Sequence, residues 1–246
     1  WPLLETMRDR AIAFVPASGR QCTTLSTMFG SHLQGMPIIA ENGTYVVRDG
    51  VDISSSTIDP NLTREVITGV RQLRNDGHDV GLVVATKSIA YLERGDDPFV
   101  SHVATYYHSH RIVKDLSEHT DDVIKLSIYD FREASEATYP TMQRTAPEHQ
   151  VILATPNWVD IMNPGVNKGS AVEAVQRDLG VTADQTAIFG DFLNDLEMMP
   201  MAKWSFAMAN GHPNIVKASN YVAPPNTENG VITVLAALLG TRVPIT

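Results

Sequence analysis

The sequence predicts an α/β fold in which a doubly wound parallel sheet is interrupted by a second, mixed α/β domain. Two observations predict this arrangement. From Asn167 onward, short apolar runs alternate strictly with helical patterns, which is typical of a parallel sheet with helices on both faces. In the middle of the chain, the apolar runs instead come in hairpin-like pairs. We therefore expect a core domain formed by residues 1–43 and 161–246, with a domain of residues 44–160 inserted into it.

The core is expected to begin with a strand over residues 11–17, a continuous apolar run of the kind that is buried on both faces of a parallel sheet. A helix through about residue 32 and a strand over residues 37–40 should follow, and Glu41-Asn42-Gly43 is a strong turn signal. After the inserted domain, the pattern predicts helices over residues 168–179, 191–201, 213–218 and 231–239, alternating with strands over residues 186–190, 205–208 and 221–223.

The inserted domain is expected to combine helices with paired strands. Its clearest helix begins at Asp59-Pro60, with Asp as N-cap and Pro at the first helical position, and ends at Gly77. Strands over residues 45–47, 51–53, 80–86, 123–129, 151–154 and 158–162, and a helix over residues 132–144, complete the prediction.

Composition and charge exclude several classes of protein. Hydrophobic residues make up 43% of the 246 residues and charged residues 19%, a globular balance that excludes a disordered chain. The formal charge of −9, without a long basic run, argues against a nucleic-acid partner. No apolar run reaches the roughly 18 residues of a membrane span. The single cysteine, Cys22, excludes an internal disulfide framework and favours a reducing cytoplasm.

Polar residues follow the first expected core strand, at the edge of the sheet where open parallel sheets bind their ligands. Ser18, Gly19 and Arg20 come directly after the strand. A hydroxyl, a glycine that lets backbone N–H groups approach a ligand, and the start of a helix can together bind an anion. Ser18 could equally be the N-cap of the next helix, since Ser is a preferred residue at that position.

Lys168 stands at the expected N-terminus of a helix, where its charge opposes the positive end of the helix dipole. A lysine placed against this preference indicates an anionic partner such as a phosphate or a carboxylate. A solvated surface lysine is the alternative interpretation.

The third polar cluster, Gly190-Asp191-Phe192-Leu193-Asn194-Asp195, follows an apolar strand. Carboxylate and amide oxygens are the hard ligands that Mg²⁺ prefers. The cluster therefore predicts a Mg²⁺ site, with Asp191 at the tip of the strand and Asp195 one turn further on. A polar loop in which Asn194 or Asp195 caps a helix is the alternative.

These residues resemble the motifs of the haloacid dehalogenase-like hydrolases, and more closely those of the Cof-type sugar-phosphate phosphatases. Val15-Pro16-Ala17-Ser18-Gly19-Arg20, Lys168-Gly169 and Gly190-Asp191-x-x-Asn194-Asp195 are similar to the second, third and fourth motifs of that family, in order and in spacing. Asn42-Gly43 and the stretch from Asn226 to Val231 also match the layout of the subfamily. The resemblance covers essentially the whole chain.

The resemblance implies a role for each matching residue. Ser18, Lys168 and Asp191 are expected to be catalytic: Ser18 hydrogen-bonds the phosphoryl group, Lys168 neutralises its charge, and Asp191 binds Mg²⁺. Asp195 is expected at the metal site, directly or in support. Substrate binding is expected to involve Ser18, Gly19, Arg20, Asn42, Lys168 and Asn194. The inserted domain would be the cap that selects the leaving group.

One motif of the family has no counterpart in the sequence. Asp-x-Asp-Gly-Thr, on the opening strand of the family, supplies a nucleophilic Asp and a general acid/base Asp, and it is absent here. Residues 1–10 read as the end of an amphipathic helix, so we expect the first core strand, with this motif, to be missing ahead of them. Phe192 is a smaller departure, since the family usually has a small residue there.

The sequence thus predicts a Mg²⁺-dependent phosphomonoester hydrolase that acts on a small soluble phosphate, such as a sugar phosphate, through an aspartyl-phosphate. The alternative is a non-catalytic phosphate-binding or regulatory protein that keeps the anion site without the nucleophile.

Overall fold

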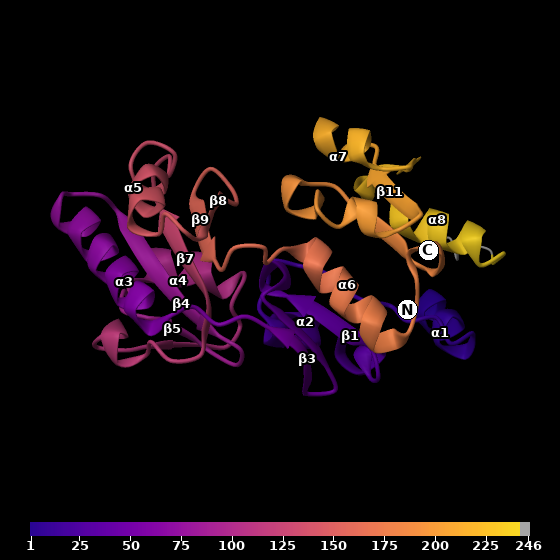
Figure 1. Ribbon diagram of the computed structural model, residues 1–246, viewed down its shortest axis with the longest axis horizontal. Helices are drawn as coiled ribbons and strands as arrows, with labels where there is room; N and C mark the ends of the chain where they lie inside the picture. The colour runs from indigo at the N-terminus through magenta and orange to yellow at the C-terminus, as the bar shows by residue number, and fades with distance from the viewer. Residues whose placement is uncertain (242–246) are drawn as a thin grey trace.

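The computed structural model describes residues 1–241 and has two lobes joined by two crossings of the chain (Figure 1). One lobe, on the left of Figure 1, runs from α3 to β9 (residues 60–162) and holds a six-stranded sheet; we call it the cap lobe. The other elements form what we call the core lobe, which holds two three-stranded sheets. Residues 242–246 of the predicted core domain lie outside the described residues. No helix within residues 1–241 has the length and apolar character that crossing a membrane requires.

The C-terminal part of the core lobe alternates strands and helices as predicted. Its three strands are parallel, in the order β10-β11-β12. These elements are β10 (Ala187–Gly190), β11 (Trp204–Met208), α7 (Pro213–Ala218), β12 (Tyr221–Ala223) and α8 (Gly230–Leu238). The helix predicted over residues 191–201 is wrong in part, because two short 3-10 segments, Leu193–Asp195 and Met199–Met201, take its place.

The second sheet of the core lobe is antiparallel, and helix α6 (Lys168–Leu179) packs between the two sheets (Figure 1). The sheet consists of β1 (Pro37–Ala40), β2 (Tyr45–Arg48) and β3 (Val51–Ser55). The α6 residues Ala171, Val172 and Val175 share one apolar cluster with Ile39 and Val46 of this sheet and with Ile188 and Ala207 of the parallel one. The bounds predicted for α6 are confirmed.

The strand predicted over residues 11–17 is wrong, because these residues make only one isolated bridge, between Ala17 and Ile39. A ladder needs a paired neighbour along its whole length. Within the described chain β1 reaches only the end of the segment, and Pro16 has no N–H to donate. The segment lies between α1 (Pro2–Asp9) and α2 (Cys22–Phe29). The first core strand, which we expect ahead of residues 1–10, stays a prediction.

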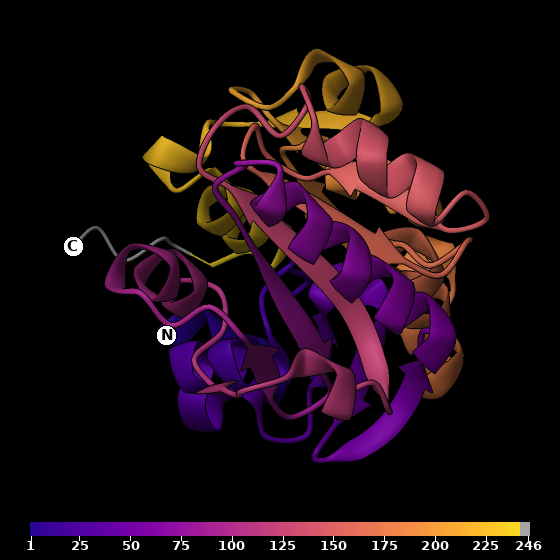
Figure 2. The ribbon, with the colours of Figure 1, turned by 90° about the vertical axis from the view of Figure 1, so that its left-hand side faces the viewer.

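The sheet of the cap lobe has the strand order β6-β5-β4-β7-β9-β8. Helices α3 and α5 cover one of its faces (Figure 2). Aromatic and aliphatic residues of α4, such as Phe99 and Val103, pack on Val83 and Ala85 at the other. The bounds are α3 (Pro60–Asn75), β4 (Val80–Thr86), β5 (Ala90–Leu92), α4 (Asp97–Ala104), β6 (His110–Ile112), β7 (Val123–Asp130), α5 (Thr138–Thr145), β8 (Gln150–Leu153) and β9 (Trp158–Met162).

The helix predicted over residues 132–144 begins later than expected. The carboxylate of Asp130 accepts hydrogen bonds from the Arg132 N–H (2.9 Å) and from the Thr138 hydroxyl (2.6 Å). These two bonds hold the intervening residues in turns, so α5 starts only at Thr138.

The two crossings between the lobes lie beside one another. The side-chain amide of Asn163 donates to the Ser56 hydroxyl (2.9 Å) and to the Thr57 carbonyl (2.8 Å). The expected boundaries lie at residues 44 and 160. In the structure β2 and β3 pair with β1, and β9 runs on to Met162. We propose that the inserted domain spans residues 57–162.

Candidate active site

A cavity of about 450 Å³ lies between the lobes and brings the three predicted polar clusters together. Every residue predicted to bind substrate or metal lines it: Ser18, Gly19, Arg20, Asn42, Lys168, Asp191, Asn194 and Asp195. The cap lobe adds Tyr106, Tyr107, Lys125, Ser127, Thr155, Trp158 and Asp160. The cavity is therefore bounded by core residues on one side and by cap residues on the other.

The first cluster, which we call the Ser18 loop (residues 18–20), is held by backbone hydrogen bonds. The Ser18 N–H donates to the Ile39 carbonyl (3.0 Å), and the Ser18 carbonyl accepts from the Asn42 N–H (3.0 Å). The Ser18 hydroxyl oxygen accepts from the Arg20 N–H (3.2 Å). Helix α2 begins only at Cys22, with Gln21 in the N-cap position, so Ser18 is not a helix cap.

Lys168 is buried at the first position of α6, with only 5% of its surface exposed, which excludes a solvated surface lysine. Its Nζ donates to Asp195 Oδ1 over 2.6 Å. Asn167 starts the helix, because its side chain accepts from the Ser170 N–H while the Ser170 hydroxyl accepts from the Asn167 N–H. The ion pair fixes the ammonium group at the cavity.

The third cluster, the Asp191 loop (residues 190–195), is closed by the buried carboxylate of Asp195. Its Oδ2 accepts from the N–H groups of Asp191 (3.0 Å) and Phe192 (3.3 Å). The Asp191 carboxylate is exposed and accepts from the side-chain amide of Asn226 (3.1 Å). Asn194 donates to Asn42 Oδ1 (3.1 Å), so the amide predicted at this site contacts the turn after β1.

A close approach between Gly43 and Asn167 connects the turn after β1 to the start of α6. Gly43 has φ +99°, and a Cβ there would lie 2.4 Å from the Asn167 carbonyl oxygen. We expect Gly43→Ala to lower the free energy of unfolding by about 3 kcal/mol, since it adds a backbone clash to an unfavourable φ. Chemical denaturation measures this loss.

Gly50→Ala is the matched control for that substitution. Gly50 has φ +79°, but a Cβ there would meet nothing within 4 Å. It should lose only the roughly 1–2 kcal/mol of the left-handed conformation. Equal losses in the two variants would mean that the contact with Asn167 adds no constraint.

Sequence reasoning assigned no role to the cap residues of the cavity. Lys125 and Asp160 carry a signal that could have found them, because each is a charged residue with apolar neighbours on both sides within a strand. Tyr106 and Trp158 carry no such signal. Their ring centroids lie 5.7 Å apart, and the Arg20 guanidinium lies 5.7 Å from the centre of the Tyr106 ring. They form an aromatic wall that faces the core residues.

Metal-binding capacity at the cavity is limited. Within residues 1–241, no three His, Cys, Asp or Glu side chains gather closely enough to hold an ion by themselves. Asp160 and Asp195 are buried, and both oxygens of each already accept hydrogen bonds. Asp191 is exposed and accepts through Oδ2 alone, so it is the cavity carboxylate best able to bind a cation. One carboxylate fits Mg²⁺, which typically takes one or two carboxylates and fills its other positions with water and substrate phosphate.

The family model of the haloacid dehalogenase-like hydrolases matches residues 3–235. The chain belongs to this family. Another haloacid dehalogenase-like hydrolase, from Bacteroides thetaiotaomicron, has a TM-score of 0.85 at 20% identity over 96% of this chain and 90% of its own. A subclass IIB sugar phosphatase of the same superfamily has a TM-score of 0.77 at 20% identity, over 97% of this chain and 90% of its own. The predicted family and the α/β fold are confirmed.

Several relatives of this chain are named as phosphatases. A 5-amino-6-(5-phospho-D-ribitylamino)uracil phosphatase of Escherichia coli is 28% identical over 98% of this chain and 88% of its own length. A phosphoglycolate phosphatase of Methanosarcina acetivorans is 31% identical over 40% of this chain and 43% of its own. This haloacid dehalogenase-like hydrolase therefore has phosphatases among its relatives.

Proposed function

We propose that the protein is a Mg²⁺-dependent phosphomonoester hydrolase that acts on a small phosphate ester such as a sugar phosphate. The observation that carries the proposal is that a hydroxyl, a buried ammonium and an exposed carboxylate from three distant segments line one cavity. The name of the Escherichia coli relative describes the phosphate ester of a ribityl chain, which belongs to this substrate class.

The core residues would divide the binding of the phosphoryl group among them. Ser18 would donate its hydroxyl proton to a phosphoryl oxygen, since its lone pair already accepts from Arg20. Lys168 would stabilise the negative charge of the transferring group, and its ion pair with Asp195 keeps the ammonium in place before the substrate arrives. Such preorganised charge is the main source of catalysis in phosphoryl transfer.

Asp191 would hold the Mg²⁺ ion, which when bound supplies positive charge next to the phosphoryl oxygens. Asp195 would support this site without coordinating the ion, because its two oxygens already face the Lys168 ammonium and two backbone N–H groups. Asn226 would hold the Asp191 carboxylate in orientation through its amide.

The nucleophile is proposed to be an aspartate on a segment that precedes Trp1. Among the described residues, Ala17 bridges only to β1 and β10 pairs only with β11, while Ala17 and Gly190 both line the cavity. A parallel strand between these two segments would carry an aspartate to the cavity. The aspartate would attack phosphorus and displace the alcohol of the ester, which leaves with a proton, to give an aspartyl-phosphate. Water would then attack phosphorus, which releases inorganic phosphate and regenerates the aspartate.

The test is hydrolysis of p-nitrophenyl phosphate by the protein with its natural N-terminus. We expect turnover with Mg²⁺, loss of turnover in excess chelator, and recovery when Mg²⁺ is added back, because Lys168 alone supplies only part of the positive charge that the phosphoryl group needs. Full turnover in chelator would rule out the metal-assisted reaction. Phosphate binding without any turnover would instead support a non-catalytic phosphate-binding protein.

A further inference from the structure

A buried polar network runs from the cap lobe to both loops of the core. Its centre is Lys125 on β7, whose side chain is only 3% exposed. Lys125 Nζ donates to the Gly19 carbonyl (3.0 Å) and pairs with Glu41 Oε2 (2.5 Å). Asp160 Oδ2 on β9 lies 3.8 Å from the same nitrogen. One ammonium of the cap therefore contacts the Ser18 loop directly.

The Gly19 contact acts on Ser18 through a single peptide group. The carbonyl that Lys125 binds and the Arg20 N–H belong to the same planar unit, so fixing one orients the other. That N–H donates to the Ser18 hydroxyl oxygen (3.2 Å). Lys125 is thus connected to the Ser18 hydroxyl through one peptide group and two hydrogen bonds.

Asp160 makes the second connection, to the Asp191 loop. Its Oδ2 accepts from the Asn42 side-chain amide (3.1 Å), and Asn42 Oδ1 accepts from Asn194 (3.1 Å). Its Oδ1 accepts from the Ser127 hydroxyl (2.6 Å), which anchors the carboxylate within the cap sheet. A continuous hydrogen-bonded path therefore joins β9 of the cap to the Asp191 loop of the core.

Such a network is a poor way to gain stability. Removing charges from water costs several kcal/mol per ion, and well-packed apolar residues often stabilise a fold as well or better. Glu41 shows this cost, since burial raises the pKa of its carboxyl group and neither of its oxygens finds a hydrogen-bond donor of good geometry among the described residues. The charges are better explained by the orientation that they impose.

We propose that Lys125 and Asp160 are positioning residues, through which the cap holds the Ser18 loop and the Asp191 loop in their reactive arrangement. The proposal deepens the proposed function and rests on it for its catalytic consequence. The two residues are proposed to position the groups that bind the phosphoryl group. Their substitution must therefore lower turnover to the same extent for every leaving group.

The kinetic test compares Lys125→Met and Asp160→Asn with Lys87→Met. Lys87 also pairs across the lobes, with Asp52, but it is part-exposed and does not line the cavity, which makes it the matched control. We expect kcat to fall about tenfold or more in the first two variants, with KM within about threefold, for both p-nitrophenyl phosphate and acetyl phosphate. Lys87→Met should keep the turnover of the parent protein.

A second measurement tests the positioning role and does not depend on catalytic turnover. In hydrogen–deuterium exchange, the amides of residues 18–20 and 191–195 should exchange faster in Lys125→Met and unchanged in Lys87→Met. If Lys125→Met does not fold, the double variant Lys125→Met/Glu41→Gln removes both charges of the pair and takes its place.

The positioning role would be wrong if Lys125→Met left hydrogen–deuterium exchange unchanged in both loops. It would also be wrong if kcat fell for only one of the two substrates. If the exchange difference is seen but the protein hydrolyses no phosphate ester, the connection between the cap lobe and the two loops is supported and the proposed function is wrong.

Discussion

Replacing Lys168 with methionine is expected to abolish most turnover and also to destabilise the fold. An ammonium beside the transferring group in a water-excluded site contributes about a hundredfold or more to the rate. Its removal also leaves the buried Asp195 carboxylate without a counter-charge, which costs about 3–5 kcal/mol. A surface lysine at a helix N-terminus, as the sequence alone allowed, would show neither loss. Turnover at saturating Mg²⁺ and chemical denaturation measure the two effects.

The double variant Lys168→Met/Asp195→Asn separates these effects. It removes both charges, and the asparagine can still accept from the N–H groups of the Asp191 loop through its remaining carbonyl oxygen. We expect much of the lost stability to return while turnover stays low. A double variant that regained turnover would show that Lys168 serves only to neutralise Asp195.

Asp191→Asn is expected to weaken Mg²⁺ binding more than about 100-fold. Substituting a residue that only hydrogen-bonds to a metal ligand typically costs about 10–100-fold in affinity, and this substitution removes the ligand itself. Stability should change by no more than about 0.5 kcal/mol, since the side chain is exposed and asparagine can still accept from Asn226. Isothermal titration calorimetry with MgCl₂ gives the affinity, and a thermal scan gives the stability.

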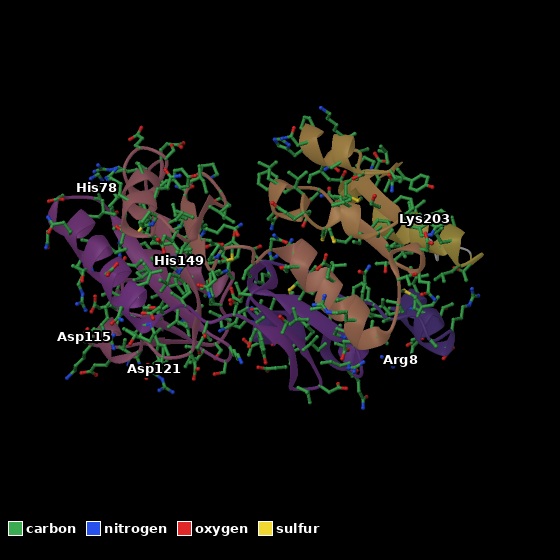
Figure 3. The ribbon with its side chains drawn as sticks, viewed as in Figure 1. Arg8, His78, Asp115, Asp121, His149 and Lys203 are labelled. Carbon is green, nitrogen blue, oxygen red and sulfur yellow. The ribbon has the colours of Figure 1, made fainter. Side chains whose placement is uncertain are left out.

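Asp184→Asn is the control for that substitution. Asp184 is another exposed carboxylate of the core, 76% exposed, but it precedes β10 and so lies at the opposite end of the strand from Asp191. It pairs with Lys203, which Figure 3 labels on the core lobe. Mg²⁺ binding should be unchanged. If Asp191→Asn also bound Mg²⁺ normally, its assignment as the ligand would be wrong.

Elements with local signals could be predicted from the sequence. Helix α6 begins and ends where predicted because Asn167 caps it and Gly180 adopts a left-handed conformation at its end, with φ 65°. Helix α3 begins at Pro60 because the Asp59 carboxylate accepts from the Asn61 N–H. The strand expected over residues 11–17 could not be judged in this way, since a strand depends on neighbours that are distant in the sequence.

The same distinction applies to the site. The Asp191 loop was predictable, because it follows β10 and parallel strands end at one edge of a sheet. Lys168 was predictable from its position against the helix dipole at the start of α6. The cap residues were not predictable, because their roles depend on how one lobe lies on the other. Lys125 contacts Gly19 across a sequence separation of 106 residues, and no periodicity or spacing in the sequence encodes such a contact.

The hydrogen bonds of Asn163 to Ser56 and Thr57 have a consequence for how such proteins can diversify. Since the chain leaves the core and returns to it at one point, the whole insertion could be exchanged for another, or for a short turn, without re-routing the core. Lys125 and Asp160 limit this modularity. A transplanted insertion would have to bring its own cation to the Gly19 carbonyl and its own acceptor to Asn42, so graft designs should keep these two positions while varying the aromatic wall.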